Sequence, residues 1–308
     1  MSVLFYSQAD DPVPWRNAFA AALPQMPFQV WPDVEDMESV RYALVWNPPS
    51  GLLEKLPKLR AVLALGAGVD ALIADPTTPQ VPVVRLLDAG LAAQMAEYAV
   101  YAVLHFHRRM RDYEKQQQKR TWNQLAPMPA SGWSVGVMGT GVIGGIILKH
   151  LVTLGYRVRG WSLSGTSIEG VESFVGEDEL DAFLSECRVV INVLPLTPST
   201  AGILGVRTFN VMPRGSYVVN IGRGGHLIEE DLLADLDSGQ IAGAMLDVFN
   251  EEPLPQSSPL WSHPNVIVTP HIAGVTIASE AEEQVIENVK RMERGETPVG
   301  VVDRSKGY

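Results

Sequence analysis

The sequence predicts an α/β protein with two doubly wound, parallel-sheet domains. Short, nearly continuous apolar runs alternate with helical stretches up to about residue 98, and a second alternation begins at residue 133 with a glycine-rich turn. Such apolar strands are typical of parallel sheets covered on both faces. At roughly 100–200 residues per domain, 308 residues also favour two domains.

The first domain is expected to contain four strands, at 2–7, 42–48, 59–68 and 81–86. Pro48 and Pro49 close the second strand, and a glycine turn ends the third. Residues 91–118 predict one long helix whose first half is apolar nearly all round and whose second half is charged. The broad apolar face favours packing against a second copy of the chain, so we expect a homodimer.

The second domain begins with a strand, a glycine turn, a helix and another strand between residues 133 and 162. Further strands are expected at 188–196, 215–222, 243–249 and 265–270, with helices near 179–186 and 229–238. The amphipathic helix after residue 275 has no obvious place in this sheet and is expected to pack on the first domain. We therefore expect one domain from 1–98 plus 277–308 and another from 99–276.

Composition and charge exclude several function classes. The formal net charge of −11 argues against nucleic acid as a partner, because phosphate binding needs clustered cations. The chain has neither a basic N-terminal region nor an apolar run of about 18 residues, so we expect no signal peptide and no membrane. The single cysteine, Cys187, cannot form an internal disulfide, which fits a cytoplasmic protein. The spacing of His and Cys residues predicts no metal site.

A glycine-rich loop indicates a dinucleotide site. Gly139, Thr140, Gly141, Val142, Ile143 and Gly144 match G-x-G-x-x-G directly after a strand and at the start of a helix. The first glycine permits the turn, the second lets the backbone approach a pyrophosphate, and the third allows close helix–strand packing. The helix N-terminus then offers N–H donors to the phosphates. A tight turn without nucleotide, or an S-adenosylmethionine site, are the alternatives.

The end of the next strand favours NADPH over NADH, although NADH stays possible. Trp161, Ser162 and Ser164 are expected to contact the cofactor there. No acidic residue follows Trp161 and Ser162 to repel a 2′-phosphate, and Ser164 can donate a hydrogen bond to it. No Lys or Arg follows either, and Arg159 could point elsewhere. Asp247 is expected either to accept from the nicotinamide carboxamide or to cap a turn. The remaining expected cofactor contacts lie near the ends of later strands, at Leu194, Pro195, Ile221 and Gly222.

Three segments that follow predicted strands each carry one chemically active group. They are "NIGRGG" with Arg223, "DVFNEEPLP" with Glu252 and "TPHIAG" with His271. Reduction of a 2-keto acid needs a cation for the carboxylate, a proton donor for the carbonyl oxygen, and a carboxylate that sets the tautomer of the donor. Because ligands of open α/β sheets gather at the carboxyl ends of strands, we expect Arg223, Glu252 and His271 to be catalytic.

The order and flanks of these three residues resemble the D-isomer-specific 2-hydroxyacid dehydrogenase family over nearly the whole chain. The resemblance implies a flavodoxin-like substrate (catalytic) domain, formed by the N-terminal segment and the last helix, and a Rossmann NAD(P)-binding domain. It places the catalytic carboxylate at the Glu before Pro, Glu252 rather than Glu251. It also implies that the backbone of Ala67, Gly68 and Val69, in "ALGAGVD", contacts the substrate carboxylate.

Several stretches look most like the glyoxylate/hydroxypyruvate reductases of that family, among them "YALVWNPP", "GAMLDVFNEEPLP" and "SPLWSHPNVIVTPHIAG". The resemblance implies reduction of glyoxylate or hydroxypyruvate with NADPH, but the basic residues expected after Ser162 are missing. Trp46 is expected either to plug the core or to line the pocket and favour small substrates. The alternative functions are a nicotinamide-sensing or co-regulator protein on the same fold, and a formate or phosphite dehydrogenase.

Overall fold

The computed structural model describes residues 1–304 and consists of two compact units. The first contains Met1–Gly90 and the chain from Thr276 onward, and the second contains Leu91–Val275. The sequence places the first boundary at residue 98, inside helix α3 (Leu91–His107), whereas the structure keeps this helix whole in the second unit. The reason is packing, because Ala96, Ala99 and Val103 of α3 are buried in the core of the second unit.

The first unit is a five-stranded parallel sheet with the order β2-β1-β3-β4-β5, which is the flavodoxin-like order. Except for the edge strand β2, its strands are nearly continuous apolar runs, as expected for a sheet covered on both faces. The strands are β1 (Ser2–Tyr6), β2 (Phe28–Val30), β3 (Val40–Val45), β4 (Ala61–Ala64) and β5 (Val83–Val84), and the helices near the start and the middle are α1 (Pro12–Ala22) and α2 (Asp70–Ala74).

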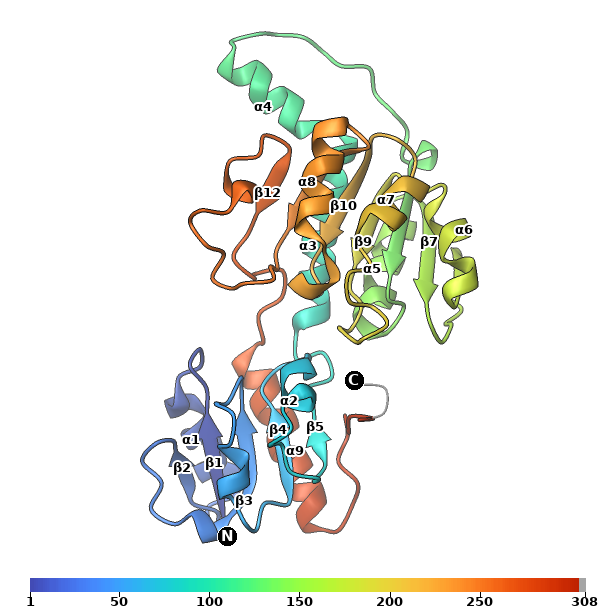
Figure 1. Cartoon of the computed structure of the whole chain (residues 1–308). Helices are drawn as coiled ribbons and strands as arrows, with labels where there is room; N and C mark the ends of the chain where they lie inside the picture. Colours follow the sequence, from blue (N-terminus) through green and yellow to red (C-terminus); the bar gives the residue numbers. More distant parts are fainter. Residues whose placement is uncertain (305–308) are drawn as a thin grey trace. The chain divides into compact units, whose positions relative to one another are not determined.

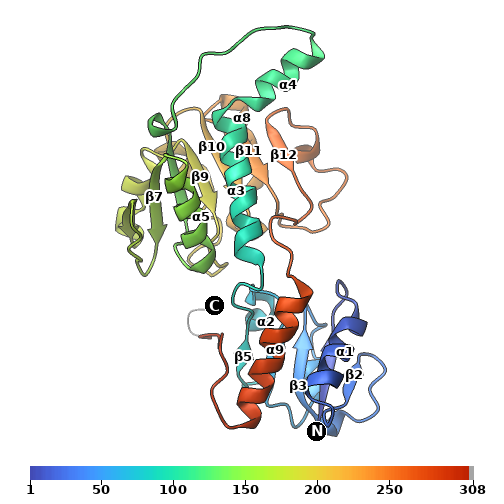
Figure 2. The same cartoon turned by 180° about the vertical axis from the view of Figure 1, so that it is seen from behind.

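Helix α9 (Ala278–Glu293) completes the first unit, as expected for the amphipathic helix that had no place in the second sheet. Its apolar residues Ala281, Val285 and Val289 are buried in one core cluster with residues of β1, α1 and β3. Figure 2 shows α9 and α1 lying side by side over the same face of this sheet.

The second unit is a seven-stranded parallel sheet with the order β12-β11-β10-β9-β6-β7-β8. Counted from its first strand this is the Rossmann order 3-2-1-4-5-6 with one added strand, so the expected fold class of two doubly wound sheets is confirmed. The strands are β6 (Ser134–Met138), β7 (Arg157–Ser162), β8 (Val171–Val175), β9 (Val189–Asn192), β10 (Ser216–Asn220), β11 (Ile241–Leu246) and β12 (Val266–Val268).

Helices cover both faces of the second sheet, which explains why its central strands are apolar on both sides. Figure 1 shows α7 and α8 over one face, and Figure 2 shows α3 and α5 over the other. The two resulting cores alternate along each strand, so that Val190 packs on one face while Val189 and Ile191 pack on the other. The helices are α5 (Val142–Thr153), α6 (Leu180–Leu184), α7 (Val206–Val211) and α8 (Glu229–Ser238).

The single helix expected over 91–118 is wrong, because the structure has two helices there. Helix α3 ends at His107, and α4 (Met110–Gln118) begins after Arg109, whose φ of 55° is left-handed. Helix α4 and the segment 119–129 extend away from the body of the second unit in both views (Figures 1 and 2). Strands β2 and β8 were also missed, since neither has a continuous apolar run.

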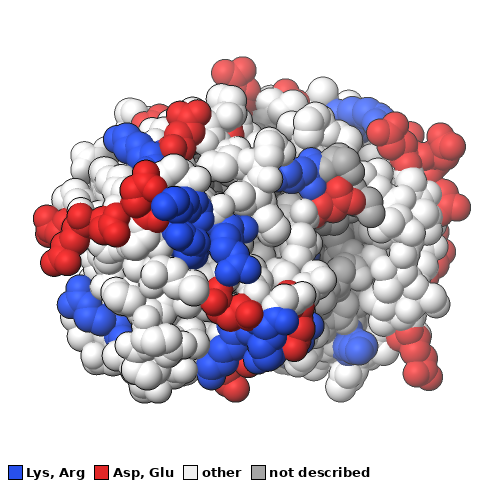
Figure 3. Space-filling model, turned by 90° about the horizontal axis from the view of Figure 1, so that it is seen from below, with Lys and Arg blue, Asp and Glu red and all other residues white. Residues whose placement is uncertain are grey.

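The presence or absence of membrane-spanning helices and the distribution of surface charge both concern possible partners. Among residues 1–304, no helix combines the length and the apolar character that crossing a membrane requires. Figure 3 shows basic and acidic side chains lying close together over the face that it presents. The first unit accordingly contains surface ion pairs such as Arg60–Glu293, at 2.7 Å.

Candidate active site

The glycine loop between β6 and α5 has the geometry of a phosphate-binding turn. Gly139 has a φ of 105°, and a Cβ on Gly144 would lie 1.7 Å from the carbonyl oxygen of Gly139, so only glycine fits there. A Cβ on Gly141 would meet nothing within 4 Å, and no side chain caps the helix that starts there. The backbone is therefore open at Gly141, where the N-terminus of α5 offers its unpaired N–H groups, and the loop fits a dinucleotide pyrophosphate.

Within this loop, Thr140 is buried and tied to the end of the next strand. Its hydroxyl donates to Oγ of Ser162 at 2.8 Å, and the amide of Gly165 donates to the same oxygen at 3.1 Å. Ser162 therefore stands where many NAD-binding domains carry an acid, and its hydroxyl hydrogen is the one group left to donate. Ser164 is exposed beyond it.

Two other residues of β7 point away from this position. Trp161, expected among the cofactor contacts, is 1 % exposed in the core, and its indole donates to the carbonyl of Gly176 at 2.9 Å. Arg159 is buried on the same face and its guanidinium pairs with Glu172 at 3.0 Å. The alternation of side chains along a strand puts both residues opposite Ser162. The placement of the Trp161 side chain at the cofactor is thus corrected.

Asp247 follows β11 and holds the loop that carries His271. Its carboxylate accepts from the hydroxyl of Thr269 at 2.6 Å and from the amides of Ile272 and Ala273, each at 2.8 Å. It is 1 % exposed. Of the two roles considered for it, the structure therefore favours turn capping over acceptance from a carboxamide.

His271 itself has an unusual backbone conformation. Its φ is 55°, in the left-handed region that non-glycine residues rarely adopt. Its amide donates to the carbonyl oxygen of Asp247 at 2.9 Å, so the surrounding bonds hold the strained residue in place. Such strain is common where a side chain has to be presented in one direction.

The imidazole of His271 is paired with Glu252. The distance between Nδ1 of His271 and Oε2 of Glu252 is 2.7 Å, and Oε1 of Glu252 accepts from the amide of Phe249 at 2.9 Å. Both side chains are partly exposed, at 41 % for His271 and 36 % for Glu252. The described residues offer Nε2 of His271 no hydrogen-bond partner, so this nitrogen is presented to solvent or to a ligand.

Arg223 lies at the start of the one-turn helix η5 (Gly224–His226), directly after β10. A Cβ on Gly224 would lie 1.9 Å from the carbonyl carbon of Phe249, so the Arg223 loop packs directly on the backbone that binds Glu252. The Arg223 guanidinium donates to the carbonyl of Gly222 at 2.8 Å. The three segments expected to be catalytic are thus joined within one unit.

The other expected cofactor residues lie around the carboxyl ends of β6, β9 and β10. Val142 is 61 % exposed, whereas Leu194 and Ile221 are almost fully buried, so their side chains are part of the core. The remaining ones, Ile143, Pro195 and Gly222, are half-buried or buried.

The expected substrate contacts Trp46, Ala67, Gly68 and Val69 all belong to the first unit, after β3 and β4. A Cβ on Gly66 would lie 2.3 Å from the Trp46 ring, so this indole packs directly on the loop that contains residues 67–69. Trp46 is half-buried, which suits both of the roles considered for it.

Sequence reasoning missed several polar groups that hold this site. Tyr98 of α3 and Thr269 are joined by a hydrogen bond of 2.6 Å between their hydroxyls, and burial raises the pKa of Tyr98 to about 12. His226, which the sequence analysis did not single out, lies against the main chain of Arg223. The available signal was the polar side chain of His226, directly after "NIGRGG", and that of Thr269, the first residue of "TPHIAG".

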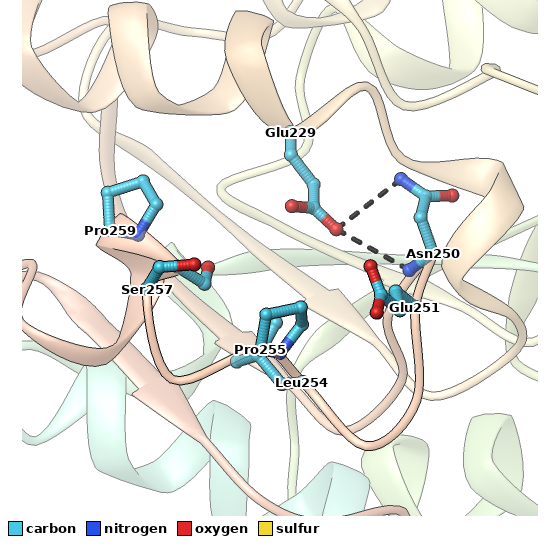
Figure 4. Close-up of a pocket in the computed structure, with 8 residues that line it drawn as sticks. Glu229, Asn250, Glu251, Leu254, Pro255, Ser257 and Pro259 are labelled. Carbon is cyan, nitrogen blue, oxygen red and sulfur yellow. Dashed lines mark hydrogen bonds between the residues drawn. The ribbon is translucent and has the colours of Figure 1, made fainter.

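One further hollow lies on the second unit, with a volume of about 330 Å³. Figure 4 shows Glu229 of α8 accepting from the main-chain and side-chain nitrogens of Asn250, with Glu251 nearby. None of Arg223, Glu252 and His271 lines this hollow. Within residues 1–304, no group of three or more His, Cys, Asp or Glu residues could hold a metal ion.

Comparison with known proteins identifies the family. Residues 100–273 match the family model for "D-isomer specific 2-hydroxyacid dehydrogenase, NAD binding domain". This match spans more than half of the chain. The chain belongs to the D-isomer-specific 2-hydroxyacid dehydrogenases. It is therefore an oxidoreductase with a nicotinamide-binding domain, as the sequence predicted.

Solved structures of family members cover the rest of the chain. A D-isomer-specific 2-hydroxyacid dehydrogenase from Xanthobacter autotrophicus Py2, in complex with NADPH and MES, is 41 % identical over 100 % of this chain and 99 % of its own, with a TM-score of 0.95. An NADPH-dependent glyoxylate/hydroxypyruvate reductase from Sinorhizobium meliloti, in complex with NADP and sulfate, is 36 % identical over 100 % of both chains, with a TM-score of 0.93.

A probable 2-hydroxyacid dehydrogenase from Rhizobium etli CFN 42, in complex with NADP, HEPES and L(+)-tartaric acid, is 34 % identical over 100 % of this chain and 99 % of its own, with a TM-score of 0.92. These similarities extend across both units, so the family assignment holds for the whole chain.

Proposed function

We propose that this dehydrogenase reduces glyoxylate, hydroxypyruvate or a similarly small 2-keto acid with NADPH. The observation that carries the proposal is the Glu252–His271 pair, whose 2.7 Å contact leaves Nε2 of the imidazole presented outward. The similarity to a glyoxylate/hydroxypyruvate reductase from Sinorhizobium meliloti supports this substrate class.

In the proposed mechanism, each of the three residues has one task. When bound, the reduced nicotinamide supplies a hydride to the carbonyl carbon. His271 donates the proton on Nε2 to the carbonyl oxygen, while Nδ1–H donates to Glu252 and so holds the ring in one orientation. The guanidinium of Arg223 binds the substrate carboxylate through two parallel hydrogen bonds.

We also propose substrate-binding roles for four residues of the first unit. The main-chain amides of Ala67, Gly68 and Val69 would donate to the carboxylate, and the ring of Trp46 would limit the size of the group carried by the keto carbon. Trp46→Ala is then expected to improve phenylpyruvate turnover relative to glyoxylate. An unchanged ratio of the two kcat/KM values would leave Trp46 only its packing role against Gly66.

The NADPH preference is supported by what stands at the end of β7. Ser162 replaces an acid there, so a 2′-phosphate meets no carboxylate, and the hydroxyls of Ser162 and Ser164 can donate to it. The relatives from Xanthobacter, Sinorhizobium and Rhizobium were all solved with NADPH or NADP. Since Arg159 pairs with Glu172 and is buried, we expect a modest preference. A tenfold higher kcat/KM with NADH would refute it.

The decisive experiment is the oxidation of NADPH and NADH with glyoxylate, hydroxypyruvate, pyruvate and phenylpyruvate. We expect turnover with glyoxylate and hydroxypyruvate, a loss of kcat in His271→Ala, and a loss of both kcat and substrate affinity in Arg223→Ala. Glu251→Gln is the matched control for Glu252→Gln, because Glu251 is the adjacent carboxylate and lines the separate hollow, whereas Glu252 is the one that bonds His271. NADPH binding without turnover of any keto acid would favour the sensing alternative.

We also propose a homodimer in the cytoplasm. Between residues 108 and 120 the chain has six basic and two acidic residues, although its total charge is −11, so this segment complements the rest of a second copy. Exposed apolar side chains lie beside it, with Trp122 at 101 % and Tyr101 at 55 %. Light scattering should give twice the chain mass, and Trp122→Ala should weaken the association. A monomeric mass at working concentration would refute the dimer.

A further inference from the structure

A fully buried histidine lies against the main chain of Arg223. His226 is 0 % exposed, its Nδ1 lies 3.1 Å from the amide nitrogen of Arg223, and its Nε2 lies 3.2 Å from the carbonyl oxygen of Pro195. Nδ1 also lies 3.1 Å from the carbonyl oxygen of Arg223. An amide can only donate and a carbonyl can only accept, so Nε2 has to donate to Pro195, and in the tautomer with hydrogen on Nε2 the Nδ1 atom accepts from the Arg223 amide. The imidazole thus takes the place that Glu or Gln has in a capping box.

The carbonyl side of Arg223 is held as well. Its oxygen accepts from Nδ2 of Asn220 at 3.0 Å and from the amide of His226 at 3.2 Å. Asn220 is also fully buried, and its Oδ1 accepts from Nδ2 of Asn192 at 2.9 Å. Both polar groups of the Arg223 main chain are therefore bonded inside the protein, which fixes the point from which the guanidinium extends.

The far side of the ring reaches the loop after β9. The carbonyl oxygen of Pro195 accepts from Nε2 of His226 and also from the hydroxyl of Thr200 at 2.7 Å. The packing there is tight, because a Cβ on Gly222 would lie 3.3 Å from Cε1 of His226. His226 therefore joins the Leu194–Pro195 turn, which we assign to the cofactor, to the loop of Arg223, which we assign to the substrate.

We propose that His226 is a positioning residue for substrate binding, because its Nδ1 holds the main-chain amide of Arg223 and so fixes the point from which the guanidinium extends. It touches neither substrate nor cofactor and acts through the main chain of Arg223. A buried imidazole is costly unless both nitrogens are bonded, and here both are. The proposal rests on the carboxylate-binding role proposed for Arg223, and the experiments below separate the two.

Three substitutions of His226 distinguish the contributions of the two ring nitrogens. In His226→Asn the amide oxygen can take the place of Nδ1 and still accept from Arg223. In His226→Gln the amide nitrogen can take the place of Nε2 and keep only the bond to Pro195, and His226→Leu keeps neither. We expect Gln and Leu to lower kcat/KM for glyoxylate on the order of 10–100-fold, since a displacement of about 1 Å has effects of this size. Asn should stay within about threefold, and KM for NADPH should change little in all three.

A merely structural histidine would give a different result. It would lower the melting temperature in all three variants and leave kcat and KM of the folded enzyme unchanged, which would overturn the proposal. Equal losses in Asn and Gln would overturn it too. His150, exposed on α5, provides the matched control His150→Leu. If the Leu variant does not fold, the comparison of Asn with Gln decides.

A double-mutant cycle tests whether His226 acts through Arg223. The readouts are kcat/KM for glyoxylate and the Kd of oxalate, a carboxylate that cannot be reduced. We expect His226→Leu to change either value less than about twofold when Arg223→Ala is already present, whereas fully additive losses would overturn the proposal. If Arg223→Ala alone has no effect, the proposed role of Arg223 fails. If Arg223→Ala is impaired and His226→Leu is not, only the role of His226 fails.

Discussion

The carboxylate of Asp247 offers a sharp test of how the His271 loop is held. Asp247→Asn keeps the shape of the side chain but replaces one acceptor oxygen by an NH2 group. The amide can keep the bonds to Thr269 and Ile272 only by turning its NH2 group toward the amide of Ala273, which is itself a donor. One buried N–H then loses its acceptor.

The magnitude follows from these three bonds. A buried donor without a partner costs about 1–3 kcal/mol. The two remaining bonds lose the negative charge of their acceptor, and charge-assisted bonds are roughly twice as strong as neutral ones. Together we expect about 2–4 kcal/mol of destabilisation in the second unit. For a unit of this size that corresponds to a fall in Tm on the order of 4–16 °C.

The assay combines thermal unfolding with amide hydrogen exchange. Because the left-handed His271 is held by the same loop, its amide and that of Ala273 should exchange on the order of 30–1000-fold faster in Asp247→Asn. Turnover should fall as the imidazole loses its fixed direction. Asp178→Asn, at an exposed position, is the control. Equal Tm and equal exchange in the two variants would refute the clamp.

Three further outcomes are expected. A Cβ on Gly144 would lie 1.7 Å from the oxygen of Gly139, so Gly144→Ala should lower the Tm of the second unit. A Cβ on Gly141 meets open space, so Gly141→Ala should weaken NADPH binding at unchanged Tm. Melting curves and calorimetric titration check the two variants, and normal NADPH affinity in Gly141→Ala would place the pyrophosphate elsewhere. Burial raises the pKa of the Cys187 thiol to about 12, so labelling by a thiol reagent at pH 8 should be slow in the native protein and fast after unfolding; rapid native labelling would contradict the burial. Burial also raises the pKa of Tyr98 to about 12 from an unfolded value of 10.0, so the native state binds this proton more tightly than the unfolded state. The free energy of unfolding that this contributes below pH 10 is lost between pH 10 and 12, at up to about 1.4 kcal/mol per pH unit. Denaturant titrations should show a shallower alkaline loss in Tyr98→Phe, and an unchanged slope would exclude Tyr98 as its source.

Local sequence predicted most strands because a buried parallel strand is apolar on both faces. The strands that were not predicted are β2 and β8. Each lies at an edge of its sheet, where one side lacks a neighbouring strand and solvent reaches the side chains. The break between α3 and α4 was not predicted for another reason. No Gly or Pro marks it, and the helix ends where His107 bonds to Tyr156 and to the carbonyl of Met128, which are contacts made by distant parts of the chain.

Local sequence also could not predict which of two consecutive residues at the end of β7 faces the cofactor. Trp161 and Ser162 are consecutive, and either could have faced the cofactor. The pleat directs Trp161 into the core and Ser162 toward Thr140, so only the packing of β7 on α6 decided which one is available.

By itself, the sequence determined the fold class, the glycine loop and the three segments with Arg223, Glu252 and His271, because each depends on residues that are close along the chain. Only the tertiary structure decided how these residues are held. Glu252 bonds His271 while its neighbour Glu251 lines a separate hollow, Asp247 caps the His271 loop, and His226 bonds the main chain of Arg223. These contacts join loops that follow different strands. They exist because parallel strands bring their carboxyl ends to one edge of the sheet, and the packing there selects which polar atoms meet.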